Sequence, residues 1–117
     1  MDDLKHITLE KNNNLCLLYL CSSGYLNLET GEEVAKVCKK EIADGNIRFL
    51  LDLSSTKMVN SIGVSLLIEV IESLEDCNGK LAFCNLAPIV EKTFKIMGLS
   101  DYASLFKTKE DALSSDW

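Results

Sequence analysis

The sequence predicts a single α/β domain with a central sheet of four to five strands. The chain has 117 residues, close to the usual size of one domain with one hydrophobic core. Hydrophobic residues make up 47% and charged residues 26%, which is the composition of a globular protein rather than of a disordered one. Short apolar runs alternate with segments of helical periodicity, and this order is typical of sheets built from crossover units.

Two short strands and a hairpin turn are predicted first. Residues 7–10 alternate weakly, and residues 15–21 form a nearly continuous apolar run. The polar tract 11–14 contains three asparagines and favours a hairpin turn, since asparagine tolerates left-handed backbone. Residues 22–24 are expected to end the second strand.

A helix is predicted over residues 29–43, followed by a buried strand. Four apolar side chains recur at helical spacing on its inner face: Val34, Val37, Cys38 and Ile42. Residues 44–46 are expected to cap this helix and form a turn. The mostly apolar run 47–53 suits a central strand covered on both faces, and residues 54–59 are expected to form a loop.

The second half of the chain predicts two more helices and one or two more strands. A helix runs from Asn60 or Ser61 to Asp76, with five side chains facing inward: Leu66, Leu67, Val70, Ile71 and Leu74. Residues 78–79 form a turn and residues 80–84 a strand.

Pro88 suits the first position of a third helix, because no N–H donor is needed there. Its expected apolar face comprises Ile89, Val90, Phe94 and Met97, and Gly98 ends it. Residues 102–106 are a candidate last strand and residues 109–113 a candidate last helical turn.

The charge balance argues against two classes of binding protein. The formal net charge is -6 and the pI is about 4.7, whereas nucleic acids and anionic membranes are bound by clustered Lys and Arg. No apolar run reaches the roughly 18–20 residues of a membrane span, and residues 1–5 lack the features of a signal peptide. We therefore expect no nucleic-acid partner, no membrane partner and a cytoplasmic location.

The sequence does not predict an enzyme, a metal site or a cofactor. The five cysteines are irregularly spaced, and His6 is the only histidine, so neither a metal site nor a Cys–His nucleophile is expected. Buried, reduced thiols are the expected state of the cysteines. Asp52 and Glu69 are weak candidates for an acid–base pair, because we expect both to be solvated. The polar loop 54–57 is a weak candidate for a phosphate cradle.

The start of the helix near residue 60 is the most informative stretch. Asn60 is a good N-cap, since its side-chain oxygen accepts a free N–H of the first turn. Ser61 would then occupy the first helical position, where the helix dipole favours negative charge by about 0.3–1 kcal/mol. A phosphoryl group would add a charge of about -1.5 to -2 there. From these residues alone, we favour the simpler interpretation, in which Asn60 and Ser61 only cap the helix and Gly63 only makes a small packing contact.

Several segments together resemble a STAS domain of the anti-sigma factor antagonist family. They are Gly24-Tyr25-Leu26-Asn27, Phe49-Leu50-Leu51-Asp52-Leu53-Ser54, Met58-Val59-Asn60-Ser61-Ile62-Gly63-Val64, and, later in the chain, residues 79–88 and 94–99. The resemblance covers about residues 5–113 and implies one STAS-like domain over residues 1–117. It implies a mixed sheet with helices mainly on one face.

The resemblance implies a phosphorylation switch. In this family, the serine of an Asp-Ser-x-Gly pattern is phosphorylated by a partner that is both an anti-sigma factor and a GHKL-type serine kinase. The unphosphorylated antagonist binds that partner and releases a sigma factor, and a PP2C-type phosphatase restores this form. Ser61 corresponds to the phosphorylated serine, Asn60 to the acid and Gly63 to the glycine. The chain departs from the pattern at Asn60, which lacks the negative charge, and at bulky Ile62.

The resemblance also implies a partner-binding surface around Ser61. Its candidate residues are Ser55, Thr56, Lys57, Met58, Asn60, Ser61, Ile62, Gly63 and Ser65, with the turn 24–27 beside them. The alternative is a STAS scaffold or adaptor module that is not phosphorylated, in which Ser61 serves only as part of the helix start.

Overall fold

The computed structural model describes residues 6–12, 15–20 and 24–117. The first two strands form an antiparallel pair, β1 (Ile7–Asn12) and β2 (Leu15–Leu20), which pair in register from Ile7↔Leu20 to Asn12↔Leu15. The strand predicted over 7–10 was two residues too short, because Lys11 and Asn12 continue the ladder instead of turning. The predicted turn at 13–14 and the predicted strand end at 21–23 lie outside the described residues.

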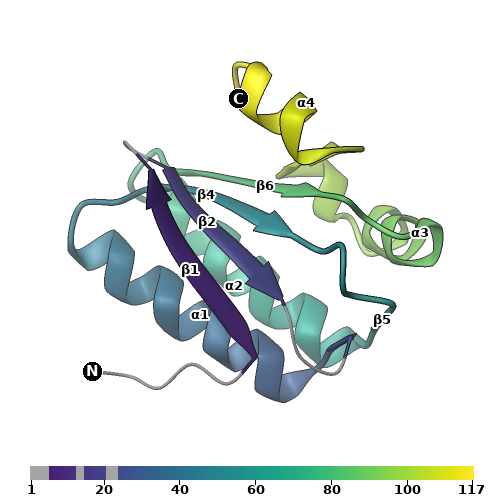
Figure 1. Ribbon diagram of the computed structural model, residues 1–117. Coiled ribbons are helices and arrows are strands. Elements are labelled where there is room, and N and C mark those ends of the chain that lie inside the picture. Colours follow the sequence, from purple (N-terminus) through teal and green to yellow (C-terminus); the bar gives the residue numbers. More distant parts are fainter. Residues whose placement is uncertain (1–5, 13–14, 21–23) are drawn as a thin grey trace.

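Three further strands extend the sheet in parallel, so the sheet is mixed, as predicted. These strands are β4 (Arg48–Asp52), β6 (Lys80–Cys84) and β7 (Ser104–Phe106). The order across the sheet is β1-β2-β4-β6-β7, and every pair after the first is parallel (Figure 1). The crossover helices are what allow parallel neighbours, since parallel strands cannot be joined by a tight turn.

Two long helices cover one face of this sheet side by side: α1 (Leu28–Ala43) and α2 (Ser61–Glu75) (Figure 1). A third helix, α3 (Pro88–Ile96), inserts Val90 and Phe94 into the same core. The Phe94 ring meets the Phe83 ring of β6 edge-on, with centroids 4.9 Å apart. A short 3-10 turn, η1 (Leu99–Asp101), then leads into β7.

The opposite face of the sheet is covered by the C-terminal segment. The last helix, α4 (Lys109–Ser114), buries Ala112 against the sheet, and Trp117 packs beside it. The sheet residues beneath them are Leu15, Leu17, Leu50, Ala82 and Cys84. Because both faces are covered there, β2, β4 and β6 are mostly apolar instead of alternating, whereas β1 at the edge of the sheet carries exposed polar residues. The prediction that helices lie mainly on one face is confirmed, with α4 as the exception.

A second, two-stranded sheet was not predicted. The turn 24–27 contains β3 (Tyr25–Leu26), and the loop 54–59 contains β5 (Met58–Val59), which pair in parallel. A strand of two residues is too short to show an alternation of apolar and polar side chains, so only its pairing in the folded protein defines it. This small sheet lies where α1 and α2 begin, since each helix follows one of its strands directly.

Two predicted side-chain positions and one predicted strand start were wrong. Ile89 is 59% exposed, so it does not belong to the buried face of α3, whose inward residues follow the spacing 90, 94 and 97. Tyr102 is 67% exposed and precedes β7 instead of starting it. Asp52 is only 6% exposed, because it is held at the end of β4: its carboxylate accepts hydrogen bonds from the Ser54 N–H and the Asn85 side chain.

Candidate functional site

Helix α2 begins as the sequence predicts. Asn60 is the N-cap, in extended conformation, and its Oδ1 accepts a hydrogen bond from the Gly63 N–H at 2.8 Å. Ser61 is the first helical residue and is exposed, as are Ile62 and Ser65. No acidic side chain lies in this first turn, so its free N–H groups face no carboxylate from the turn itself.

The small sheet fixes where this helix starts. The Asn60 N–H donates to the Leu26 carbonyl at 3.1 Å, and the Lys57 N–H donates to the Gly24 carbonyl at 2.7 Å. Gly24 has a φ of +76°, a conformation that glycine adopts without steric cost. The turn 24–27 and the loop 54–59 are thereby joined by backbone hydrogen bonds directly before α2 begins.

Two glycines allow α1, α2 and β3 to approach closely. A Cβ on Gly63 would lie 2.4 Å from the Leu26 carbonyl oxygen, and a Cβ on Gly31 would lie 2.7 Å from the Leu66 side chain and 3.4 Å from the Gly63 Cα. Gly63 has no room for a side chain because backbone atoms obstruct it, whereas at Gly31 the Leu66 side chain would have to move. Gly63 is therefore buried against the protein itself.

The N-termini of α1 and α2 converge at this site. Asn27 caps α1, with its Oδ1 accepting from the Thr30 N–H at 3.2 Å, in the same way that Asn60 caps α2. Since β3 and β5 are paired, the two caps follow neighbouring strands. Each helix N-terminus contributes a partial positive charge, so an anion at Ser61 would be placed beside two of them.

The structure exposes most of the predicted partner-binding residues but not all of them. Ser55, Lys57, Met58, Ser61, Ile62 and Ser65 are exposed and Asn60 is half-buried. Thr56 is 1% exposed and Gly63 is buried, so neither can present a side chain to a partner. Thr56 is buried because the turn that follows β4 folds back, with its N–H bonded to the Leu53 carbonyl at 2.9 Å.

An apolar surface beside Ser61 includes a residue that the sequence analysis assigned to the core. Met58 is 57% exposed, Ile62 51% and Ile89 59%. A hollow of about 130 Å³ separates β5 from the start of α3, and Met58 and Ile89 line it together with Val59 and Thr93. The helical spacing of Val90, Phe94 and Met97 would have placed Ile89 outside the buried stripe.

The titratable groups of the described residues form no cluster at Ser61. His6 lies between Glu29 and Glu33 of α1, with its Nε2 3.4 and 3.5 Å from their carboxylates. Among the residues that the structure describes, no group of three His, Cys, Asp or Glu side chains could hold a metal ion. Over the same residues, no helix is both long enough and apolar enough to cross a membrane.

The described cysteines are free thiols and most are buried. Cys16, Cys38 and Cys84 are buried and Cys77 is half-buried, whereas Cys21 lies outside the described residues. Burial raises the pKa of Cys38 far above its usual range, and burial together with the charge of Asp52 raises the pKa of Cys84 to about 12. These thiols are poor nucleophiles at neutral pH.

Comparisons with known proteins agree with this architecture. The STAS domain family model matches residues 6–112. A relative from Bordetella bronchiseptica, named "Putative anti-sigma factor antagonist BtrV", is 25% identical over 93% of this chain and 92% of its own.

Two solved structures are similar in fold. An anti-sigma factor antagonist from Mycobacterium paratuberculosis has a TM-score of 0.77, with 21% identity over 92% of this chain and 90% of that one. The Bacillus cell fate determinant SpoIIAA, in its phosphorylated form, has a TM-score of 0.72, with 21% identity over 92% and 96%. With the family model matching nearly the whole length, the chain belongs to the STAS domain family.

Proposed function

We propose that this protein is an anti-sigma factor antagonist whose binding is switched off by phosphorylation of Ser61. The observation that carries the proposal is the position of Ser61: exposed, first in α2, and beside the start of α1. The names of the relatives support the general role, and structures of SpoIIAA in phosphorylated and unphosphorylated forms share this fold. In this role the chain supplies no catalytic group and is itself the substrate of a kinase.

Phosphorylation at Ser61 would leave the helix intact and change the surface around it. The free N–H groups of the first turn and the dipole of α2 favour negative charge, so a phosphoryl group there is tolerated by the fold. The exposed residues of the candidate partner-binding surface include two large apolar side chains, Met58 and Ile62. A partner that covers these side chains would also have to desolvate a phosphoryl group, which opposes binding.

The partners that fit this role are an anti-sigma factor with GHKL-type serine kinase activity and a PP2C-type phosphatase, acting in the cytoplasm. Asn60 keeps the cap that an aspartate would provide, through its bond to the Gly63 N–H, but adds no charge next to the hydroxyl. Ile62, half exposed, adds apolar contact area where a small residue would add little. We therefore expect the kinase to present an apolar surface where it contacts Ile62.

Binding of the cognate anti-sigma kinase to two variants tests the proposal by isothermal titration calorimetry. Ser61→Asp should abolish binding and Ser61→Ala should retain it, because only the first places charge on the apolar surface. Ser114→Asp is the matched control, since it adds the same charge at an exposed position of α4. If both Ser61 variants bind like the wild type, the protein is an adaptor without a switch and the proposal fails.

A further inference from the structure

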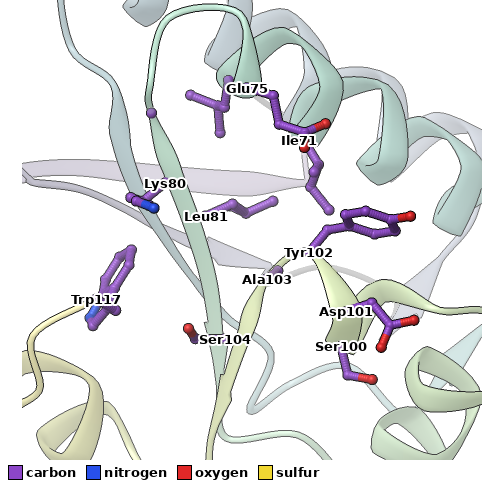
Figure 2. Close-up of a pocket in the computed structure, with 12 residues that line it drawn as sticks. Ile71, Glu75, Lys80, Leu81, Ser100, Asp101, Tyr102, Ala103, Ser104 and Trp117 are labelled. Carbon is purple, nitrogen blue, oxygen red and sulfur yellow. The ribbon is translucent and has the colours of Figure 1, made fainter.

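A two-part groove lies at the opposite end of α2 from Ser61. Its larger part holds about 420 Å³ and is enclosed by the end of α2, the start of β6 and the η1–β7 segment (Figure 2). Its smaller part holds about 220 Å³ and lies between α2 and the end of α3. Ile71, Glu75 and Tyr102 line both parts, so the two hollows are adjacent and share these side chains as a common wall.

The smaller part of the groove has an apolar floor, and the rim of the whole groove is mostly acidic. Ile68, Ile71 and Met97 line the smaller part, and the exposed ring of Tyr102 stands between the two parts. The exposed carboxylates are those of Glu72, Glu75 and Asp101. Of the described lining residues, Lys80 is the single base, and in Figure 2 it lies with Trp117, away from Tyr102 and Asp101.

The acidic side chains on this side of α2 have no ion-pair partner among the described residues. Residues 61–75 contain Glu69, Glu72 and Glu75 and no lysine or arginine. These glutamates are three residues apart, where like charges repel, and they lie towards the C-terminus of the helix, where the dipole disfavours them. Within the described part of the chain, neither Glu72 nor Glu75 nor Asp101 forms an ion pair. A positively charged partner would relieve this repulsion.

We propose that this groove binds a basic amphipathic segment of a partner protein. Apolar side chains of the segment would fill the floor beside Tyr102, and its Lys or Arg side chains would reach Glu72, Glu75 and Asp101. Glu75 lies fourteen residues after Ser61 on the same helix, about 21 Å away at 1.5 Å per residue. The groove is therefore a second interface that is separate from Ser61, and its occupancy does not depend on phosphorylation there.

The test uses a synthetic, fluorescein-labelled peptide with leucines on one helical face and lysines on the other. A scrambled peptide of equal composition, whose leucines share no face, is the reference. Fluorescence anisotropy should show tighter binding of the amphipathic peptide, and ¹⁵N NMR should place its chemical-shift changes on the second half of α2 and on η1. Glu72→Gln with Glu75→Gln should weaken binding about fivefold or more, because both charges lie on the rim. Tyr102→Ala should also weaken it.

The matched control is Glu32→Gln with Asp44→Asn, which removes two exposed charges at α1 and its C-cap. This control and Ser61→Asp should each change the affinity less than about twofold, since neither alters the groove. If this control loses as much peptide affinity as Glu72→Gln with Glu75→Gln does, the effect comes from the net charge of the protein and the proposal is overturned. Equal binding of the scrambled peptide, shift changes spread over other acidic surfaces, or no binding at about 1 mM peptide would overturn it too.

Discussion

Gly63→Ala tests the close approach that positions Ser61. The substitution adds one methyl group in the first turn of α2, at a buried position that faces β3. By helix propensity alone it should stabilise the protein by about 1 kcal/mol, because alanine is the better helix former. The packing at this position predicts the opposite sign.

The size of the effect follows from the distances. The new Cβ would lie 2.4 Å from the Leu26 carbonyl oxygen and 2.8 Å from its carbon, whereas Cβ atoms essentially never come closer than 3.0 Å to another heavy atom. The obstructing atoms are backbone, so no side-chain rotation relieves the contact. Overpacking of this kind costs about 1–3 kcal/mol, and with immovable backbone atoms the upper part of that range applies. After the propensity gain, the net loss is about 1–2 kcal/mol.

Urea unfolding followed by far-UV circular dichroism measures this difference. Ser65→Ala is the matched control, since it lies on the exposed side of the same helix turn and should stabilise by about 0.5 kcal/mol or less. Gly63→Ala should also weaken partner binding, because α2 must move away from β3 and carry Ser61 with it. A Gly63→Ala protein more stable than the wild type would refute the packing described for this site.

Three further predictions concern the cap, an ion pair and the thiols. Asn60→Ala should lower the free energy of unfolding by about 1 kcal/mol while Asn60→Asp stays near the wild type, and equal losses in urea would contradict the capping role. Burial alone would raise the pKa of Glu41, but hydrogen bonds from Lys11 and Asn46 outweigh it and hold this pKa below its ordinary value of 4.5. The carboxylate therefore stabilises the fold above about pH 4.5 and loses this effect as the pH falls through the lowered pKa. Glu41→Gln should flatten that part of the acid-unfolding curve, and an unchanged curve would argue against the ion pair. Among the described cysteines, half-buried Cys77 should react first with a thiol reagent at pH 8, and buried Cys84 should react only when the protein unfolds. Peptide mass spectrometry identifies the order of labelling. Early labelling of Cys84 would contradict its burial.

The fold could be predicted from the sequence because its main elements carry strong local signals. The apolar runs of β2, β4 and β6, the cap at Asn60 and the proline that opens α3 each identify an element from neighbouring residues alone. The small sheet of β3 and β5 could not be predicted, since it depends on two distant turns meeting in space. The last two residues of β1 could not be predicted for a similar reason. Lys11 and Asn12 are polar, and they belong to the strand only because β2 pairs with them.

The candidate site was predictable in part. The exposure of Ser61 follows from its place at a helix start, which local capping rules define. The burial of Thr56 does not, because a turn that folds back over β4 places it inside. The same holds for Gly63, which is packed against a strand that the sequence does not reveal. Ile89 was assigned to the core from its chemistry, although its helical position faces outward.

Mass spectrometry of the protein after incubation with its cognate kinase and ATP tests the central proposal most directly. The proposal predicts one phosphate, on Ser61, and loss of kinase binding by the purified phosphorylated form. It also predicts that a PP2C-type phosphatase restores binding. A phosphate on Ser55 or Ser65 and never on Ser61, or a Ser61-phosphorylated protein that binds like the unmodified one, would contradict it.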